Sequence, residues 1–269
     1  MNLRDKYLVV PGAKVKLARW DPGDTAGLDS KKQALPELDD LRKKLYDLQY
    51  LLYAERRQSL LVVLQAMDAG GKDGTIRHVM RGLNPQGCHV TSFKVPTEEE
   101  LSHDYLWRVH RAVPGKGEIG IFNRSHYGDV LVVRVHNLVP KRVWSKRFEQ
   151  INAFEKMLAE NGVTIVKFFL HISKEEQKKR LRERLDDPTK HWKISAADFE
   201  DRKHWDDYIT AHEDALARCS TPWAPWYVVP ADQKWFRNLA VADILVRTLK
   251  DMKMRFPKPN LDLSKFVLD

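Results

Sequence analysis

Cysteine, long apolar runs and low-complexity segments are all scarce in this 269-residue sequence. Its two cysteines, Cys88 and Cys219, lie far apart without a CxxC spacing, which favours reduced structural thiols over a disulfide framework or a zinc site. No apolar run approaches the roughly 20 residues that a membrane-spanning helix needs, and the N-terminal MNLRDKYLVV lacks a signal-peptide pattern. These absences predict a cytoplasmic protein with no membrane partner.

Several familiar catalytic and binding motifs are also missing. The sequence has no Ser/His/Asp arrangement, helix-turn-helix, zinc spacing or RNP-like aromatic motif, so no specific nucleic acid is expected as a partner. It does have positive charge, because 46 Lys and Arg against 37 Asp and Glu give a net charge of +9. This surplus indicates a polyanionic partner, either nucleic acid, an anionic membrane or a phosphate-rich molecule, and composition does not choose among them. A merely basic surface is the simpler alternative.

One stretch combines an apolar strand, a glycine-rich turn and a helix start: LLVVLQAMDAGGKDGTIR, residues 60–77. Glycines let backbone N–H groups turn inward, the helix dipole favours negative charge, and Lys72 can neutralise phosphate oxygens, as in P-loop proteins. The stretch departs from G-x-x-x-x-G-K-[ST], because Ala66 replaces the first glycine and Asp73 follows the lysine. An ordinary strand-to-helix turn with a surface lysine is the alternative.

Apolar strands alternate with helical patterns along the rest of the chain. This alternation predicts an α/β fold with a mostly parallel sheet of about five strands and helices on both faces. The expected strands are residues 60–64, 89–95, 119–122, 163–172 and 226–229, and the main expected helices are 37–57, 141–160, 196–217 and 233–252. Residues 1–36, rich in Pro and Gly, are expected to form an irregular N-terminal arm, and residues 37–269 a single domain.

Three polar motifs follow predicted strands: Asp68–Lys72, Asn123–Tyr127 and the charged helix after Ile172. In parallel sheets ligands bind beyond the carboxyl ends of the strands, so these motifs are expected at one edge of the sheet. Their convergence favours phosphate binding more strongly than the loop does alone.

Five segments carry a family resemblance: LQAMDAGGKDGTI (64–76), PTEEELSHDYLWRVH (96–110), GEIGIFNRSHYGDVLV (117–132), KFFLHISKEEQKKRLRERLDDPTKHWK (167–193) and APWYVVPAD (224–232). On these segments, over roughly residues 38–250, the chain resembles the polyphosphate kinase 2 family. The resemblance implies a thymidylate-kinase-like P-loop kinase domain with a helical lid at about residues 174–202. It also implies magnesium-dependent transfer of phosphate between inorganic polyphosphate and AMP, ADP or ATP, by a homodimer or homotetramer.

The resemblance also assigns residues to roles. It implies that Asp68 holds the accepting nucleotide phosphate or its magnesium, that Lys72 grips phosphate at the reacting centre, and that Arg124 contacts phosphate across the site. These three are the expected catalytic residues. Asn123 is expected to contact the metal and, with Tyr127, the nucleotide. The other expected phosphate or polyphosphate contacts are Gly70, Gly71, Asp73, Gly74 and Thr75 in the loop, and Arg180 and Arg184 in the lid.

Two positions depart from common patterns of the family. Asn123 stands where many members have an aspartate, so it can offer an oxygen to a metal but contributes no charge. The form NRSHY resembles the subgroup that phosphorylates both AMP and ADP, yet Gly128 stands where that subgroup often has glutamate. The sequence therefore leaves the preference between AMP and ADP open.

Phosphoryl transfer to an anionic phosphate oxygen needs positioning and charge neutralisation rather than a strong general base. Two other functions stay open at this point. One is a nucleoside monophosphate kinase that uses ATP as donor, and the other is a non-catalytic module that binds a polyanion or nucleic acid. The identity of the phosphate donor distinguishes the first, and the effect of Lys72→Ala on turnover distinguishes the second.

Overall fold

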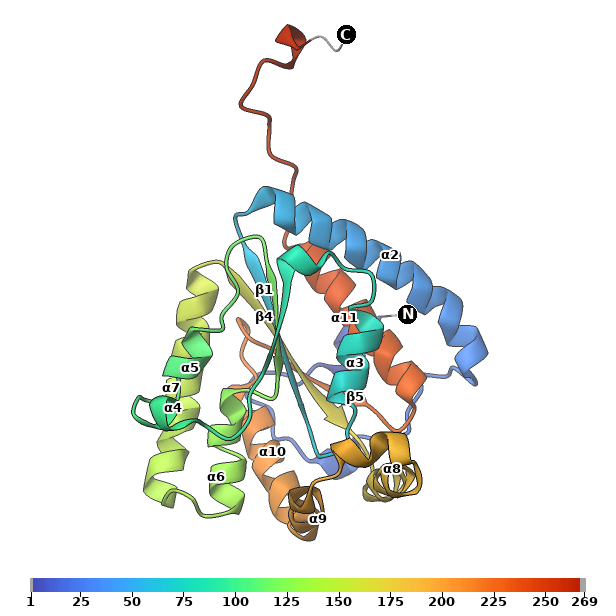
Figure 1. Cartoon of the computed structure of the whole chain (residues 1–269), viewed down its shortest axis with the longest axis vertical. Coiled ribbons are helices and arrows are strands. Elements are labelled where there is room, and N and C mark those ends of the chain that lie inside the picture. Colours follow the sequence, from blue (N-terminus) through green and yellow to red (C-terminus); the bar gives the residue numbers. More distant parts are fainter. Residues whose placement is uncertain (1, 267–269) are drawn as a thin grey trace.

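A parallel sheet forms the centre of the computed structural model, which describes residues 2–266 (Figure 1). Within those residues the sheet has five strands in the order β2-β3-β1-β4-β5, and every neighbouring pair is parallel. The strands are β1 (Ser59–Ala66), β2 (Cys88–Ser92), β3 (Ile119–Asn123), β4 (Val163–His171) and β5 (Trp226–Pro230). The predicted α/β class and the five predicted strands are confirmed, although the second strand ends at Ser92 rather than at residue 95.

Helices cover both faces of this sheet (Figure 1). On one side α11 (Lys234–Asp251) packs against α1 (Leu3–Tyr7), α2 (Lys31–Glu55) and α3 (Lys72–Val79). On the other side α6 (Val132–Val135), α7 (Lys141–Glu160) and α10 (Trp205–Cys219) contact one another. The remaining helices are α4 (Glu98–Leu101), α5 (Trp107–His110), α8 (Lys174–Asp186) and α9 (Ala196–Lys203). No helix within residues 2–266 is long and apolar enough to cross a membrane.

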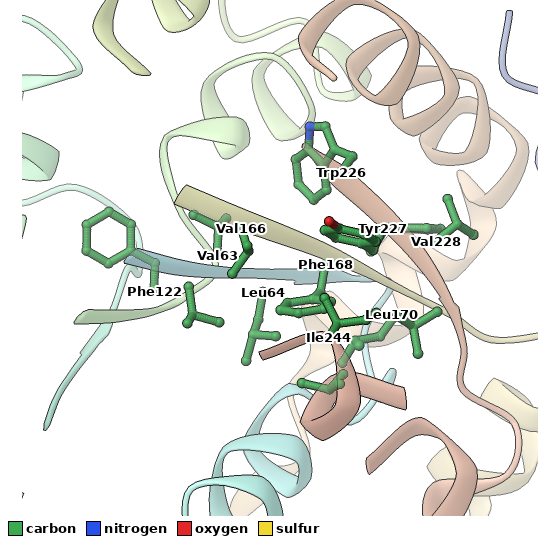
Figure 2. Close-up of a cluster of buried hydrophobic side chains, with 14 of the residues drawn as sticks. Val63, Leu64, Phe122, Val166, Phe168, Leu170, Trp226, Tyr227, Val228 and Ile244 are labelled. Atoms are coloured by element: carbon green, nitrogen blue, oxygen red, sulfur yellow. The ribbon is translucent and has the colours of Figure 1, made fainter. Parts of the chain in front are cut away.

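The strands carry buried side chains on both faces of the sheet. Every residue of β1 except Ala66 is buried, and β5 is buried along its whole length. Such continuous burial is expected of parallel strands that have helices above and below them. Figure 2 shows Ile244 of α11 beside Phe168 and Leu170 of β4 on one face, while Trp226 of β5 lies on the opposite face.

Residues 2–30 pack against the edge of the sheet formed by β5. The Val9 amide donates to the Trp226 carbonyl oxygen (2.9 Å), and Leu8 forms an isolated antiparallel bridge with Tyr227. Apart from α1 this segment has little regular structure, and its contacts make it part of the packed domain.

Two predicted helices have different boundaries in the structure. The helix expected from residue 37 begins at Lys31, because buried Ala34 anchors an additional turn and Pro36 is accommodated inside the helix. The helix expected over residues 196–217 is divided into α9 and α10 at His204, whose backbone (φ −92°, ψ 24°) leaves the helical region. This break lets α10 pack on α7 while α9 lies with α8 near the carboxyl ends of the strands (Figure 1).

A buried charged cluster joins β4 to α7. Lys167 of β4 and Glu155 of α7 are both fully buried and form an ion pair. The Lys167 ammonium also donates to the Tyr127 hydroxyl (2.8 Å). Burial alone would raise the pKa of Glu155, but Lys167 and His126 lower it below its ordinary value. The cluster therefore fixes the segment that follows β3 against α7.

Lys167→Met should lower the free energy of unfolding by about 3–5 kcal/mol, because it leaves the Glu155 carboxylate buried without its partner. Urea denaturation measures the change. Lys156→Met is the matched control, since Lys156 lies on α7 in an exposed pair with Glu160 and should barely shift the unfolding midpoint. If the two variants lost equal stability, the buried pair would not be the cause.

Candidate active site

Two positions of the turn between β1 and α3 accept no side chain larger than that of glycine. A Cβ atom placed on Gly70 would lie 2.5 Å from the Ala66 Cβ and 2.7 Å from the Met67 carbonyl oxygen. Gly71 adopts φ +99°, in the left-handed region that favours glycine. Helix α3 starts at the next residue, and the Thr75 hydroxyl donates to the Gly71 carbonyl oxygen (3.1 Å). The turn thus presents a helix N-terminus at the carboxyl end of β1, as a P-loop does.

Lys72 opens α3, and its side chain folds back over the turn. Its ammonium donates to the Ala66 carbonyl oxygen (3.2 Å), and only 9% of the residue is exposed. Burial lowers the pKa of Lys72 to about 8, although the carboxylates of Asp68 and Asp73 act to raise it. Because this ammonium has lost most of its hydration, a bound anion would stabilise its charged form.

Two contacts join this turn to the residues at the end of β3. Arg124 donates to a carboxylate oxygen of Asp68 (3.1 Å), and the Asn123 amide nitrogen donates to a carboxylate oxygen of Asp73 (2.7 Å). The Arg124 N–H donates to the carbonyl oxygen of Leu64 in β1 (3.1 Å), with Arg124 at φ +62°. The structure therefore brings Asp68 and Asp73 of the loop motif together with Asn123 and Arg124 of the motif that follows β3.

The two arginines predicted to reach polyphosphate from the lid have other partners. Arg180 of α8 is 5% exposed and donates to the Glu176 carboxylate (2.8 Å) and to the Ala69 carbonyl oxygen (3.1 Å). Arg184 pairs with Asp198 of α9 (3.0 Å). The structure does not support a direct polyphosphate contact by Arg180, because its guanidinium is buried and holds the loop backbone instead.

Tyr127 lies in the core rather than at the loop. It is fully buried, and its hydroxyl donates to Glu155 of the buried charged cluster (2.9 Å). Burial and the Glu155 carboxylate raise the pKa of Tyr127 well above its ordinary value. The nucleotide contact predicted for Tyr127 is not supported, because its side chain has no exposed surface to offer.

Three further residues near the loop have no signal in the sequence. Gln177 of α8 donates to the Asp68 carbonyl oxygen (3.0 Å). Asp198 of α9 is partly buried, and burial together with the Asp68 carboxylate raises its pKa. Arg237 of α11 is 2% exposed and lies against Gly71. Each belongs to a helix with many polar residues, and only packing reveals which of them face the loop.

The oxygen atoms at this edge of the sheet fit a magnesium ion that is held mainly by substrate phosphates. Mg²⁺ in phosphoryl-transfer sites is commonly bound through one or two carboxylates together with phosphate oxygens. Asp68 and Asp73 supply carboxylates. The amide nitrogen of Asn123 donates to Asp73, so the amide oxygen of Asn123 can still bind a metal. In the described part of the chain, no three His, Cys, Asp or Glu side chains gather in a way that could hold a metal ion. The donor set therefore suits a hard cation shared with phosphate.

The family model described as Polyphosphate kinase 2 (PPK2) matches residues 28–257. The chain belongs to the polyphosphate kinase 2 family. A Meiothermus ruber protein named AMP/ADP-polyphosphate phosphotransferase is 57% identical over 265 residues, which are 98% of this chain and 99% of the relative. A Rhodopseudomonas palustris protein named ADP-polyphosphate phosphotransferase is 46% identical over 96% of this chain and 94% of its own length.

A solved structure supports the same placement. The crystal structure of polyphosphate kinase 2 from Arthrobacter aurescens TC1 matches with a TM-score of 0.91 and 44% sequence identity. The match covers 94% of this chain and 91% of that one. The family and the P-loop kinase fold expected from the sequence are confirmed.

Because it is a polyphosphate kinase 2 protein, the chain should bind inorganic tripolyphosphate less tightly as the pH rises through about 8. Above the lowered pKa of Lys72, the free protein loses the ammonium charge that would face phosphate. Isothermal titration calorimetry on both sides of this pH measures the effect. Lys72→Arg keeps its charge throughout this range and should give a flatter profile. Parallel profiles for the two proteins would contradict the role of Lys72 titration.

Proposed function

We propose that this chain transfers a phosphoryl group between inorganic polyphosphate and AMP or ADP, with magnesium as the metal. The observation that carries the proposal is the convergence of Asp68, Lys72, Asn123 and Arg124 at the carboxyl ends of β1 and β3. The choice of substrates is supported by similarity, over nearly the full length, to the protein named AMP/ADP-polyphosphate phosphotransferase.

Charge neutralisation is the main task of such a site, because two polyanions must approach each other. Lys72 offers a poorly hydrated ammonium at the loop, and the N-terminus of α3 offers backbone N–H groups. Arg124 is about half exposed, with 52% of its side chain accessible, and Asp68 orients it toward the loop. Magnesium, when bound, would neutralise charge on the transferred phosphoryl group.

The acceptor needs no general base, since its attacking atom is already an anionic phosphate oxygen. The residues of the site instead hold donor and acceptor in line and limit access of water. The predicted lid corresponds to α8 and α9, from which Gln177 donates to the loop and Asp198 approaches Asp68. In this proposal the lid helices order the loop and shield the reacting phosphates.

Assembly as a homodimer or homotetramer is part of the same proposal. The outer face of α2 exposes Tyr46 and Tyr50, at 48% and 52%, and Phe256 packs against Tyr50 at a centroid distance of 6.1 Å. An exposed aromatic patch of this kind suits a contact between copies of the chain.

The phosphate donor provides the decisive test. ADP should form from AMP when inorganic polyphosphate and Mg²⁺ are present and ATP is absent. Lys72→Ala should lower the rate by about 10²-fold or more, because it removes a charge that acts at the reacting phosphate. Lys156→Ala, a change of the same charge on the exposed face of α7, should leave the rate unchanged.

Other outcomes of this assay identify the alternatives. Transfer from ATP alone would make the chain an ATP-dependent nucleoside monophosphate kinase. Binding of polyphosphate without turnover would make it a non-catalytic polyanion-binding module, and an active Lys72→Ala variant would remove the P-loop mechanism.

Gly128→Glu tests the acceptor preference. A Cβ atom added at Gly128 meets no atom within 4 Å, so a side chain can start from this position without a clash at its first carbon. Because the subgroup that this chain resembles often carries glutamate here, the substitution should raise kcat/KM for AMP relative to ADP severalfold. Gly128→Gln, of equal size but without charge, is the control. If the AMP-to-ADP ratio stays flat, this position does not set acceptor choice.

A further inference from the structure

Arg237, in the first turn of α11, packs directly against the phosphate loop. A Cβ atom on Gly71 would lie 1.9 Å from the Arg237 Nη1 atom, and a Cβ atom on Gly74 would lie 3.2 Å from its Nη2 atom. The guanidinium therefore occupies the volume that side chains at these two positions would need. Its burial, at 2% exposure, separates it from bulk water.

The partners of Arg237 do not neutralise its charge. Its Nε and Nη2 atoms both donate to the neutral amide oxygen of Asn238 (3.2 and 2.9 Å). No carboxylate within residues 2–266 comes as close as 4.0 Å to its guanidinium. By contrast, buried Lys167 pairs with Glu155, and buried Arg180 pairs with Glu176. Buried charges are normally paired, so an unpaired one at a ligand-facing loop calls for an external partner.

The charges around Arg237 increase this imbalance. The Cβ position on Gly71 lies 3.5 Å from Nη1 of Arg180, so the two guanidiniums meet at the same glycine. Burial, together with the Arg180 charge, lowers the pKa of Arg237 to about 9. The N-terminus of α3 and the Lys72 ammonium add positive potential on the same loop. Arg237 thus adds a buried positive charge, without a carboxylate of its own, to a loop that already carries these positive groups.

We infer that Arg237 is a positioning residue of the phosphate site, which fixes the Gly71–Gly74 backbone and raises the positive potential behind it, so that a phosphate polyanion supplies its missing counter-charge. Arg237 acts through the loop, because its guanidinium packs on Gly71 and Gly74 and is almost completely buried. The inference rests on the proposed function for the identity of the anion, and it extends that function to a residue outside every motif of the sequence.

Calorimetric titration of the whole protein with inorganic tripolyphosphate tests the inference. Arg237→Met should weaken binding about tenfold or more, whereas Arg237→Lys, which keeps the charge, should recover part of the loss. The dependence of log Kd on log salt concentration should be shallower in Arg237→Met than in Arg237→Lys, because one fewer charge acts on the ligand. Lys250→Met, on the exposed end of α11 about 20 Å further along the helix, is the charge-matched control.

Asn238→Leu separates an electrostatic role from a purely structural one. This change removes the hydrogen bonds that anchor Arg237 but leaves its charge, so tripolyphosphate binding should stay within about threefold of the wild type. Equal losses in Asn238→Leu and Arg237→Met, with equal salt dependence, would overturn the inference in favour of simple packing. Unchanged binding in Arg237→Met would also overturn it and leave the proposed function intact. Failure of the wild type to bind tripolyphosphate would remove both.

Discussion

The register between β1 and β3 is the constraint on which the site depends. Leu64 pairs with Asn123, so the two strands end side by side and the Arg124 N–H reaches the Leu64 carbonyl oxygen. A shift of one residue would turn every side chain of β3 to the opposite face. The contact between Arg124 and Asp68, which lie 56 residues apart in the chain, would then be lost. Backbone pairing in the core thus determines the geometry of charged groups at the surface.

Poorly hydrated positive charge is the second feature that unites the structure. Lys72 and Arg237 come from different helices, yet burial lowers the pKa of both, to about 8 and about 9. Arg180 adds a third buried cation that holds the loop backbone. A surface that merely carried positive charge would leave such groups in water. Their burial around one glycine-rich turn matches a ligand that brings its own negative charge, as polyphosphate does.

The contact between Asn123 and Asp73 explains why Asn123 can replace the aspartate that is common in the family. Its amide nitrogen donates to the Asp73 carboxylate, whereas an ionised aspartate at that position would place two carboxylates face to face. Asp73 itself stands where the common P-loop pattern has Ser or Thr. The two unusual residues therefore compensate each other between the start of α3 and the end of β3, although neither position explains the other when the sequence is inspected alone.

The sequence by itself determined the parallel α/β fold, the glycine loop with Lys72 and the family. Each of these is recognised from short contiguous segments, by their hydrophobic periodicity or by the spacing of their residues. It also located Asp68 and Arg124, since both lie within two residues of the end of a strand. Only the tertiary structure decided that Tyr127 and Arg180 are buried and that Arg237 lies behind the loop. The physical reason is that burial and through-space charge depend on which face of a helix packs inward. The sequence of a helix with several polar residues does not show which of them will face the core.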